Sequence, residues 1–477
     1  MSIPKIIFLS QEEIKRIHGK SLQILEEVGI MFGSQKALKI LEAAGCQVDW
    51  DELSAKIPPH LVEQAIGTLP SRFLLAARDP AKDIICGDGN LYFTASGQSL
   101  WVRDMETRKR RSSNLNDLIQ CVRLIDALDE VDENCAMVMP RDIPPGIGEL
   151  KSLQISLQHT TKHFLGGGTE LSTIPYGKEM IAAVLGDIDR LREQPLFSAV
   201  INPVSPLSNR GELVDCTLEW AAYKVPIFLQ FLPLGGGTAP ITLAGTVLEA
   251  NTEFLGNMTL YQLAEPGWPI IWALAGGSVD MRSGRWAFGP EGVLMTVALI
   301  EMAKFYGVPS NSWGHCSTEA KAIGFQSGVE GMMPGLMAAL AGVDNMWGPA
   351  DLDGATMVDP AYIILATEAI HQTRRLLQGM NTDEEYFLYD VITKMGFQGE
   401  YLSDPSTKKY FREEHLLPKL FPRQSYESWE MRGESEEDIA LAKVKEILDK
   451  HEPEPLPDDV NKELDRIMTA AEEALLR

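Results

Sequence analysis

Residues 227–255, IFLQFLPLGGGTAPITLAGTVLEANTEFL, contain the unit that decides the fold. An apolar run of strand length ends in three consecutive glycines, and a longer stretch with helical spacing follows it. The spacing predicts a loop over 235–237, with Thr238 as the N-cap of the helix and Pro240 in its first turn. We therefore expect a strand, a loop and a helix in direct succession.

The same unit recurs over residues 115–380. Short apolar runs return roughly every 30 to 45 residues, separated by longer segments with helical spacing. The runs are CAMVMP (135–140), HFLGGG (163–168), FSAVINP (197–203), IFLQFLP (227–233), IIWALAG (270–276), PSNSWGH (309–315) and VDNMW (343–347). Alternating strands and helices form parallel βαβ units, and about seven visible strands with a plausible eighth favour a closed (β/α)8 TIM barrel. A doubly wound open sheet is the alternative.

Two segments of different character flank this region. Residues 1–114 mix short helices with strands and predict an N-terminal α+β cap. Residues 381–477 predict a helical C-terminal extension, which the proline-rich acidic spacer HEPEPLPDD (451–459) interrupts. We expect this extension to pack on the barrel exterior or on a neighbouring chain.

Composition excludes several classes of protein. The 477 residues carry 43 basic and 67 acidic side chains, and the resulting formal charge of −24 would repel a nucleic acid backbone. No apolar run is long enough for a membrane span or a signal peptide, so we expect a cytoplasmic protein. The six cysteines lie far apart without a CxxC pair, which favours neither a disulfide framework nor a zinc ribbon.

Several motifs that could carry chemistry are incomplete. The glycine loop lacks the GK[ST] of a nucleotide-binding loop. His159 and His163 are four residues apart, but no metalloprotease glutamate or third ligand accompanies them. His315 and Cys316 are adjacent, so in an extended chain they point to opposite faces. Lys321 could form a Schiff base in principle, although its charged surroundings indicate a solvated lysine.

The predicted strand ends instead carry aromatic and amide side chains. They are Phe231, Trp272, Trp313, Trp347, Asn202, Gln230, Asn311 and Asn345. A quaternary ammonium group has no N–H to donate, so a protein holds it with aromatic faces and diffuse negative charge, at about 0.5 to 2 kcal/mol for each ring. The sequence is compatible with such a site, and also with tryptophans that only fill the barrel.

Four blocks together resemble the trimethylamine methyltransferase (MttB-like) superfamily. They are INPVSPL (201–207), PLGGGTAPITLAGTVLEANTEFL (233–255), VDMRSGRWAFGPE (279–291) and GHCSTEAKAIGFQSGVE (314–330). The resemblance extends from the N-terminal cap to residue 380 or beyond. It implies a (β/α)8 barrel that passes a methyl group from an amine to the cobalt of a separate corrinoid protein, with no metal or cofactor held by the chain itself.

One departure from the family pattern concerns the substrate. The trimethylamine enzymes carry pyrrolysine in the loop that matches 314–317, where this sequence reads GHCS. It also reads GFQ at 324–326, where the pattern tends to have Asp before Gln. The chain therefore resembles the branch without pyrrolysine, whose members demethylate glycine betaine, proline betaine or carnitine. We expect glycine betaine as the first choice of substrate.

The charge of such a substrate, taken with the aromatic and amide side chains at the strand ends, leads to a hypothesis for the site. Trp313, His315 and Trp347 are expected around the ammonium group, with positioning as their role, and Asn202 and Gln230 on the floor of the site. Further candidates are Phe231, Trp272, Asn345 and Glu249 or Glu253. A betaine carboxylate would need Arg282 or the helix that follows Gly237.

The flat corrinoid of the partner needs an open barrel mouth, and glycine loops would leave one. The loop residues expected to face it are Gly166, Gly167, Gly235, Gly236, Gly237 and Gly276. We also expect a homo-oligomer, and no membrane or nucleic acid partner. A barrel lyase or aldolase and a non-catalytic betaine-binding protein are the alternatives.

Overall fold

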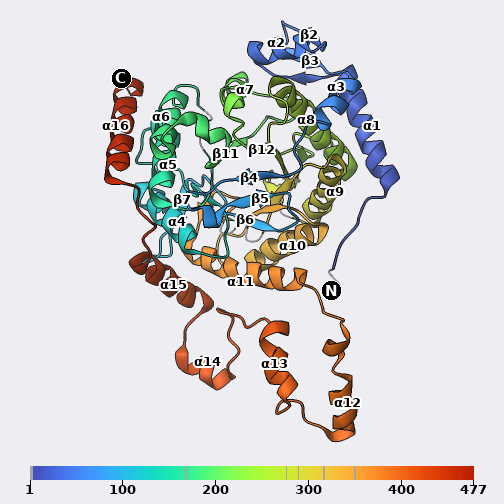
Figure 1. Cartoon of the computed structure of the whole chain (residues 1–477), viewed down its shortest axis with the longest axis vertical. Helices are drawn as coiled ribbons and strands as arrows, with labels where there is room; N and C mark the ends of the chain where they lie inside the picture. Colours follow the sequence, from blue (N-terminus) through green and yellow to red (C-terminus); the bar gives the residue numbers. More distant parts are fainter. Residues whose placement is uncertain are drawn as a thin grey trace.

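The computed structural model describes residues 4–166, 168, 170–274, 277–287, 289–314, 317–348 and 351–476. Its centre is a sheet of eight parallel strands (Figure 1). In chain order they are β6 (Tyr92–Thr94), β9 (Asn134–Cys135), β10 (Phe164–Leu165), β11 (Phe197–Ile201), β12 (Ile227–Phe231), β14 (Ile270–Leu274), β17 (Ser310–Trp313) and β18 (Asn345–Trp347). The last strand pairs with the first, and a parallel bridge from Thr94 to Glu133 joins β6 to the start of β9. The sheet therefore closes on itself.

Helices connect successive strands and surround the sheet. They are α4 (Leu115–Ala127), α5 (Pro145–His159), α6 (Ile174–Leu185), α7 (Gly211–Leu218), α8 (Leu243–Ala264), α9 (Pro290–Tyr306), α10 (Phe325–Ala341) and, after the last strand, α11 (Pro360–Leu377). Figure 1 shows them as a ring around the strands. This arrangement confirms the predicted (β/α)8 TIM barrel.

Helix α8 begins later than the sequence predicts. The glycine segment forms a short strand, β13 (Leu234–Gly235), which pairs with β15 (Gly277–Val279) above the barrel. The hydroxyl of Thr238 accepts a bond from the Leu234 amide inside this turn, and Thr242 is the residue that caps the helix. The predicted N-cap at Thr238 is therefore wrong, because the chain makes an extra strand before it turns back.

The N-terminal segment covers one side and the amino end of the barrel. Helices α1 (Gln11–Glu27) and α3 (Pro59–Ile66) pack on α8, beside α2 (Gln35–Ala43) and a small sheet of β1 (Ile30–Met31), β3 (Ser54–Lys56) and β2 (Gln47–Asp49). A hairpin of β4 (Phe73–Leu75) and β5 (Ile84–Cys86) follows. The chain beyond β4 bonds to backbone just before β10 and β11, which places it at the amino end.

The first barrel strand lies within residues 1–114, the segment that we expected to be a cap. Strand β6 has three residues, and its ladder partner β18 lies about 250 residues away. Local periodicity cannot reveal so short a strand, because its pairing is entirely long-range. The barrel therefore starts before the boundary that the sequence indicates.

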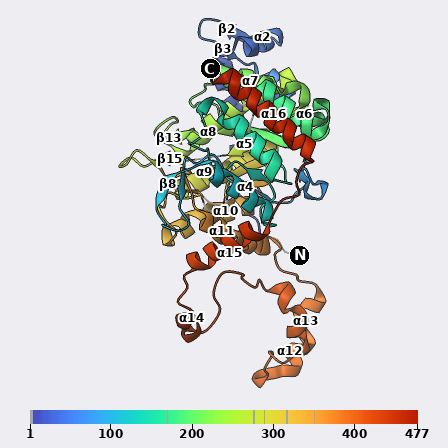
Figure 2. The same ribbon diagram turned by 90° about the vertical axis from the view of Figure 1, so that its left-hand side faces the viewer.

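Two small sheets flank the carboxyl end of the barrel. One combines β13 and β15 with β16 (Trp286–Ala287). The other joins β7 (Trp101–Arg103) and β8 (Arg110–Ser112) to β20 (Met357–Val358) and β19 (Asp351–Leu352). Because these strands follow barrel strands in sequence, they mark the carboxyl end, which lies toward the left of Figure 2.

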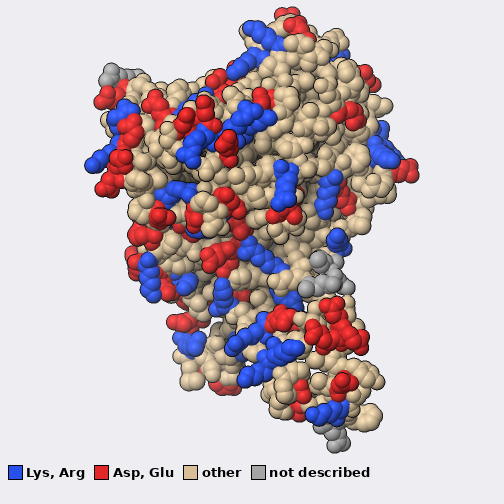
Figure 3. Space-filling view, viewed as in Figure 1, with Lys and Arg blue, Asp and Glu red and all other residues tan. Residues whose placement is uncertain are grey.

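The C-terminal segment returns to the barrel exterior, as predicted. Helix α15 (Glu436–Lys450) packs on α11 and α4, and α16 (Asp458–Leu475) packs on α5 and α6. Between α11 and α15 the chain leaves the barrel and forms α12 (Tyr389–Met395), α13 (Pro405–Glu414) and α14 (Tyr426–Arg432) (Figures 1 and 2). Among the described residues, no helix has the length and apolar character of a membrane span. Acidic and basic side chains intermingle on the face shown in Figure 3.

Candidate functional site

A cavity of about 790 Å³ opens at the carboxyl end of the barrel. Its walls include residues at or just beyond the ends of β6, β10, β11, β12, β17 and β18. The carboxyl end is where TIM barrels carry their active sites, because the loops there can vary without disturbing the barrel. We therefore take this cavity as the candidate site.

Three tryptophans form one corner of the cavity. Trp313 ends β17 and Trp347 ends β18, and their ring centroids lie 5.5 Å apart with the planes at 86°. Trp286 of β16 meets Trp313 in the same way, at 5.3 Å and 84°. Below them Phe228 stacks on Trp347 with the centroids 6.4 Å apart. Rings at right angles present faces in two directions, as a site for a small cation requires.

The two predicted floor residues also line the cavity. Gln230 of β12 is buried, and Asn202 lies just after β11 and is exposed at the opening. The structure therefore brings Asn202, Gln230, Trp313 and Trp347 together in one cavity, although they come from four different strands. The roles predicted for them remain predictions.

Charged side chains give the cavity a negative balance. Among the described residues that line it, three are carboxylates, Glu149 of α5, Glu170 after β10 and Glu212 of α7, and one is an arginine, Arg210. Burial raises the pKa of Glu170, and the nearby charges of Glu149 and Glu212 raise it further. A cavity mouth with this charge attracts a cation. A bound cation in turn favours the ionised form of the Glu170 carboxyl group.

A buried carboxyl group ties two walls of the cavity together. Asp351 of β19 accepts a hydrogen bond from Ser96, which follows β6 and lines the cavity, and its other oxygen lies 3.5 Å from the hydroxyl of Ser99. Burial raises the pKa of Asp351 to about 7. The loop after β18 therefore fixes the loop after β6.

Phe231 and Trp272 do not line the cavity, which corrects the expectation for both. Neighbours along a strand point to opposite faces, and Gln230 already points inward. Phe231 is buried outside the cavity, while Trp272 stacks on Phe254 of α8 with centroids 4.0 Å apart and planes at 8°. Both rings fill the layer between strands and helices.

Asn345 lies one layer below the cavity, in a buried polar network. Its amide oxygen accepts bonds from Thr94 at 2.6 Å and Asn311 at 2.8 Å, and its amide nitrogen donates to Glu133 at 3.2 Å. Burial raises the pKa of Glu133 to about 7. Asn345 therefore supports the floor from beneath instead of lining the cavity, which corrects its predicted place.

His163 belongs to this buried layer and not to a metal site. Its ring bonds to the Ala76 carbonyl at 2.9 Å and to the Ser198 hydroxyl at 2.8 Å, and one carboxylate oxygen of Glu133 lies 3.6 Å away. Burial lowers the pKa of His163 to about 4, so the ring is neutral. In the part of the chain that the structure describes, no cluster of three His, Cys, Asp or Glu residues suits a metal.

The acidic candidates on α8 lie outside the cavity wall. Glu253 accepts bonds from the Ser205 hydroxyl at 2.9 Å and the Leu207 amide at 2.7 Å, and so holds the turn after β11. Burial raises the pKa of Glu253 and that of Glu249 to about 7. These contacts give Glu253 a packing role, and both glutamates lie on α8, which is covered by N-terminal helices.

The other charged candidates are also engaged elsewhere. Arg282 is 93% exposed and lies 3.7 Å from Asp280 in its own hairpin. Lys321 lies 2.9 Å from Asp353, and it lines no part of the cavity. A Schiff-base role for Lys321 therefore has no support from its position.

The predicted glycine loops divide into two kinds. Gly166 lines the cavity, and open space lies where a Cβ atom would point. The three glycines of the second kind, Gly235, Gly236 and Gly237, do not line the cavity. A Cβ atom at each would come within 2.7 to 2.9 Å of a side chain, so these glycines allow close packing around β13. His315, Gly167 and Gly276 lie outside the described residues.

Among the described residues that line the cavity, five charged or aromatic ones are not predicted by the sequence patterns. They are Trp286, Glu149, Glu170, Glu212 and Arg210. Glu170 comes soon after the glycine turn that ends β10, and Glu212 lies in the first turn of α7, so a search for acids beyond strand ends would have found both. Trp286 gives no such signal, because it reaches the cavity from a hairpin.

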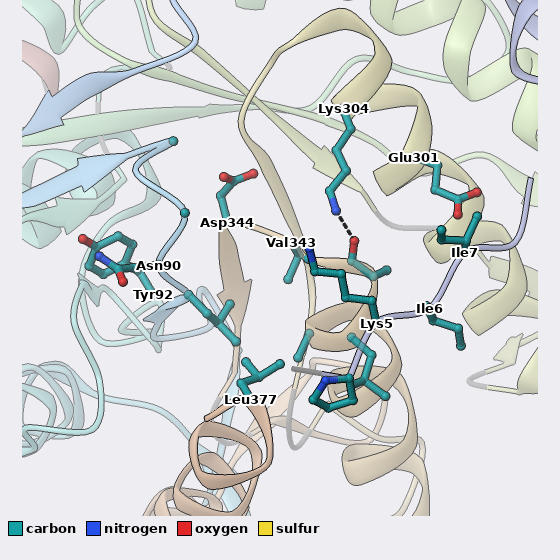
Figure 4. Close-up of a pocket in the computed structure, with 18 of the residues that line it drawn as sticks. Lys5, Ile6, Ile7, Asn90, Tyr92, Glu301, Lys304, Val343, Asp344 and Leu377 are labelled. Carbon is teal, nitrogen blue, oxygen red and sulfur yellow. Dashed lines mark hydrogen bonds between the residues drawn. The ribbon is translucent and has the colours of Figure 1, made fainter. Parts of the chain in front are cut away.

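A larger cavity, of about 1250 Å³, lies at the opposite end of the barrel (Figure 4). It is lined by the N-terminal segment and by residues that precede strands, such as Asn90 and Asp344. Two of its charged groups already have partners, since Asp344 accepts from the backbone and hydroxyl of Ser310 and Lys304 donates to the Ala341 carbonyl. We therefore do not take it as the candidate site.

Comparison with known proteins gives full-length matches. Residues 1–474 match the family described as trimethylamine methyltransferase (MTTB). Trimethylamine methyltransferase MttB of Desulfitobacterium hafniense (strain DSM 10664 / DCB-2) is 31% identical over 469 residues, 97% of this chain and 94% of the relative. Glycine betaine methyltransferase of D. hafniense (strain Y51) is 28% identical over 465 residues, 97% and 96% of the two chains.

Solved structures show the same architecture. The crystal structure of the Methanosarcina barkeri monomethylamine methyltransferase (MtmB) superposes with a TM-score of 0.55 at 13% identity, covering 99% of this chain and 88% of that one. This likeness supports the barrel and no more. The full-length sequence matches show that the chain is a methyltransferase and belongs to the trimethylamine methyltransferase (MTTB) family.

Proposed function

We propose that this methyltransferase takes a methyl group from a quaternary amine and transfers it to Co(I) of a corrinoid carried by a separate protein. Glycine betaine is the first choice of substrate, with proline betaine and carnitine-like amines next. The observation that carries the proposal is the tryptophan corner in an acidic cavity, where Trp313 meets Trp286 and Trp347 nearly at right angles. The relative named for glycine betaine supports a quaternary amine, and the relative named for trimethylamine, a tertiary amine, supports the broader class of methylated amines.

The corner suits a permanently charged nitrogen. A quaternary ammonium group cannot donate a hydrogen bond, so ring faces and nearby carboxylates are what can hold it. Trp286, Trp313 and Trp347 supply the faces, and Glu170 lies in the same cavity. The preference of such a site for a cation over a neutral molecule of the same shape is about 0.5 to 2 kcal/mol per ring.

Arg210 favours a betaine over an amine without a carboxylate. Among the described residues that line the cavity it is the one basic side chain, and a guanidinium binds a carboxylate through two parallel hydrogen bonds. A zwitterion with one positive and one negative end therefore fits a cavity that has tryptophans in one part and Arg210 in another. This assignment replaces Arg282, which lies outside the cavity.

Demethylation of a quaternary amine requires little proton transfer by this chain. When a quaternary nitrogen loses a methyl group it leaves as a neutral tertiary amine, so no general acid is needed. Co(I) of the corrinoid supplies the nucleophile. The tryptophans orient one N–CH₃ bond toward the opening, which can be worth on the order of several kcal/mol, and they exclude water that would stabilise the cationic ground state.

The opening fits a flat macrocycle that approaches from outside. Gly166 leaves free space on one wall, and the rim residues Asn202, Arg210 and Glu212 are exposed and not packed under a lid. The cavity of about 790 Å³ is at the upper end of the range of about 300 to 1,000 Å³ typical of sites for small molecules. It can therefore take a small amine and remain accessible above it.

The decisive experiment is optical. The purified chain is mixed with a reduced corrinoid protein, quaternary amines are added one at a time, and loss of the Co(I) absorption is followed together with formation of the demethylated amine. We expect glycine betaine to give the fastest loss. Spectra that stay unchanged with every amine, trimethylamine included, would overturn the proposal.

A matched pair of variants links the rate to the tryptophan corner. Trp313→Ala should lower kcat/KM at least 10-fold, because it removes the ring that contacts both neighbours. Trp50→Ala removes an indole that is 41% exposed on the N-terminal segment and should leave the rate unchanged. Equal rates in both variants would remove Trp313 from the site.

A further inference from the structure

A buried carboxyl group lies beneath the floor of the candidate cavity. Glu133 is 0% exposed and stands two residues before Cys135, which ends β9 and lines the cavity. In an extended chain, side chains two residues apart face the same side, and the step between them is roughly 6 to 7 Å. Glu133 therefore occupies the layer of the barrel interior just below the cavity.

The strand register places this layer under the tryptophan corner. Asn311 and Asn345 stand two residues before Trp313 and Trp347, on β17 and β18. The amide nitrogen of Asn345 donates to Oε2 of Glu133 at 3.2 Å, and that of Asn311 donates to the amide oxygen of Asn345 at 2.8 Å. The carboxyl group of Glu133 is thus one layer of side chains away from the rings of the corner.

The contacts of Glu133 require a proton on its carboxyl group while the cavity is empty. The hydroxyl oxygen of Thr94 lies 2.5 Å from Oε2 of Glu133 and 2.6 Å from the amide oxygen of Asn345. A hydroxyl has one hydrogen to donate. Because the amide oxygen has none, the Thr94 hydrogen goes to Asn345, and the hydrogen of the other contact comes from Glu133. Burial favours the same neutral form, since it raises the pKa of Glu133 to about 7.

The described surroundings of Glu133 offer little to stabilise its anion. Oε1 of Glu133 has no hydrogen-bond partner among the described residues, and it lies 3.6 Å from Nε2 of His163. The other ring nitrogen, Nδ1, faces the Ala76 carbonyl and so carries the hydrogen of the ring. Nε2 then accepts from the Ser198 hydroxyl and has no hydrogen to give to Glu133.

Charged groups on the neighbouring elements do not supply a positive charge either. Asp132, next in the chain, raises the pKa of Glu133 further, and its own carboxylate pairs with Arg374 at 2.8 Å. The Lys162 ammonium donates to three backbone carbonyls at 2.6 to 2.7 Å. Asp351, the other buried carboxyl group behind the cavity wall, faces serine hydroxyls. Within the part of the chain that the structure describes, a countercharge for Glu133 therefore has to come from a ligand.

We propose that Glu133 is the buried countercharge of the substrate, and that it releases its proton to solvent when a quaternary ammonium group enters the tryptophan corner. The inference rests on the proposed substrate class and not on the transfer of the methyl group. Two unit charges roughly 10 Å apart, at an effective dielectric constant of about 20, shift an ionisation equilibrium about 10-fold. Glu133 acts through its charge without touching the substrate, so it is a positioning residue.

The proposal gives substrate binding a defined pH dependence. The cation binds more tightly when Glu133 is ionised, so the affinity for glycine betaine should rise as the pH rises through the pKa of about 7. The rise should be about 10-fold between pH 5 and pH 9. A ligand of the same shape without the positive charge should show no such rise.

The first test is isothermal titration calorimetry of the full chain without a corrinoid protein. Glycine betaine is titrated at pH 6.5 in PIPES and in ACES, two buffers with different heats of ionisation, and the difference in apparent enthalpy counts the protons released. We expect about 0.5 proton per bound betaine, which is what a 10-fold shift from a pKa of about 7 gives at this pH. The uncharged carbon analogue 3,3-dimethylbutyrate should release none.

Two matched variants locate the proton. Glu133→Gln keeps the shape of the neutral side chain, so it should release almost no proton and should raise Kd for glycine betaine about 10-fold at pH 8. Its Kd for 3,3-dimethylbutyrate should not change, which a merely structural defect would not achieve. Glu249→Gln is the control, because burial raises the pKa of Glu249 to about 7 as well but this residue lies outside the cavity wall. The control should release the full amount.

Infrared difference spectroscopy of the unaltered chain needs no variant. Glycine betaine should remove the C=O band of a protonated carboxyl group and add the bands of a carboxylate. An unchanged carboxyl band, betaine binding without proton release, or full release in Glu133→Gln overturns the inference and leaves the proposed function standing.

The remaining outcomes separate the inference from the proposed function. Proton release that depends on Glu133 supports the inference even if no methyl group reaches a corrinoid, a result that would count against the proposed function alone. If neither glycine betaine nor tetramethylammonium nor choline binds, the inference falls together with the proposed substrate class.

Discussion

The indole rings of Trp313 and Trp347 meet at 86°, with centroids 5.5 Å apart, at the ends of two adjacent barrel strands. The register that pairs these two residues makes the corner a property of the barrel and not of a loop. A site built on paired strands holds its geometry closely. Methyl transfer along a defined line depends on such precision.

Removing Trp286 should weaken selection for charge. We expect Trp286→Leu to raise KM for glycine betaine about 5- to 20-fold, since one ring contributes about 0.5 to 2 kcal/mol to cation binding. The specific readout is inhibition by 3,3-dimethylbutyrate, the uncharged carbon analogue of the betaine. Its inhibition constant should change little in the variant, whereas a purely structural defect would weaken both ligands together.

Replacing Arg210 should affect only substrates that carry a carboxylate. Arg210→Gln is expected to raise KM for glycine betaine about 10- to 100-fold, because a hydrogen bond to a charged group is worth about 1.5 to 3 kcal/mol. The rates with tetramethylammonium and choline, which carry no carboxylate, should be the same in the variant as in the unaltered chain. Arg282→Gln serves as the control, since that side chain is 93% exposed outside the cavity. A uniform loss for all amines would contradict the assignment.

Stability should fall as the pH rises from about 5 to about 8. Burial raises the folded-state pKa of Glu133 to about 7, so this carboxyl group stabilises the folded protein below its unfolded pKa, and that contribution is lost as the pH rises through the folded pKa. Each pKa unit corresponds to about 1.4 kcal/mol. Thermal unfolding of Glu133→Gln should show a flatter pH profile, and an unchanged slope would show that Glu133 is not responsible.

Gly314 should not tolerate a larger side chain. A Cβ atom there would collide with Met346 and with the carbonyl of Trp347, so Gly314→Ala should push β18 aside and destabilise the fold by about 1 to 3 kcal/mol. Gly328→Ala in α10 is the matched control, because nothing lies within 4 Å of the added atom. That control should be neutral or stabilising by up to about 1 kcal/mol. Urea unfolding of the two variants measures the difference.

The barrel could be predicted from the sequence, but the inward face of each strand could not. Parallel strands are buried on both sides, so Trp272 and Trp313 stand at similar apolar strand ends with nothing in the local pattern to distinguish them. In the structure Trp313 faces the cavity and Trp272 stacks on Phe254. The difference lies in the register of the closed sheet, which depends on residues far away in the sequence.

Other parts of the site lay beyond local patterns for different reasons. Trp286 reaches the cavity from a β16 hairpin whose partner strand, β15, is short, and Arg210 precedes α7 without a motif to mark it. The short strand β6 cannot be predicted from the sequence, because three residues are too few to show a periodicity. Helices α12, α13 and α14 lie in the segment that the sequence predicts to be helical, but no local pattern reveals how exposed their apolar side chains are.

The hydrogen bond from Thr94 to Asn345 spans 251 positions of the chain and belongs to the seam between the first and last barrel strands. A nascent chain on the ribosome can pair β9 through β17 in the order of synthesis, but β6 can form its ladder only after β18 has been made. Until then the sheet has two edge strands whose unpaired backbone groups can bond to other chains. Any stop codon between α10 and β18 should therefore yield an insoluble product and not a smaller enzyme.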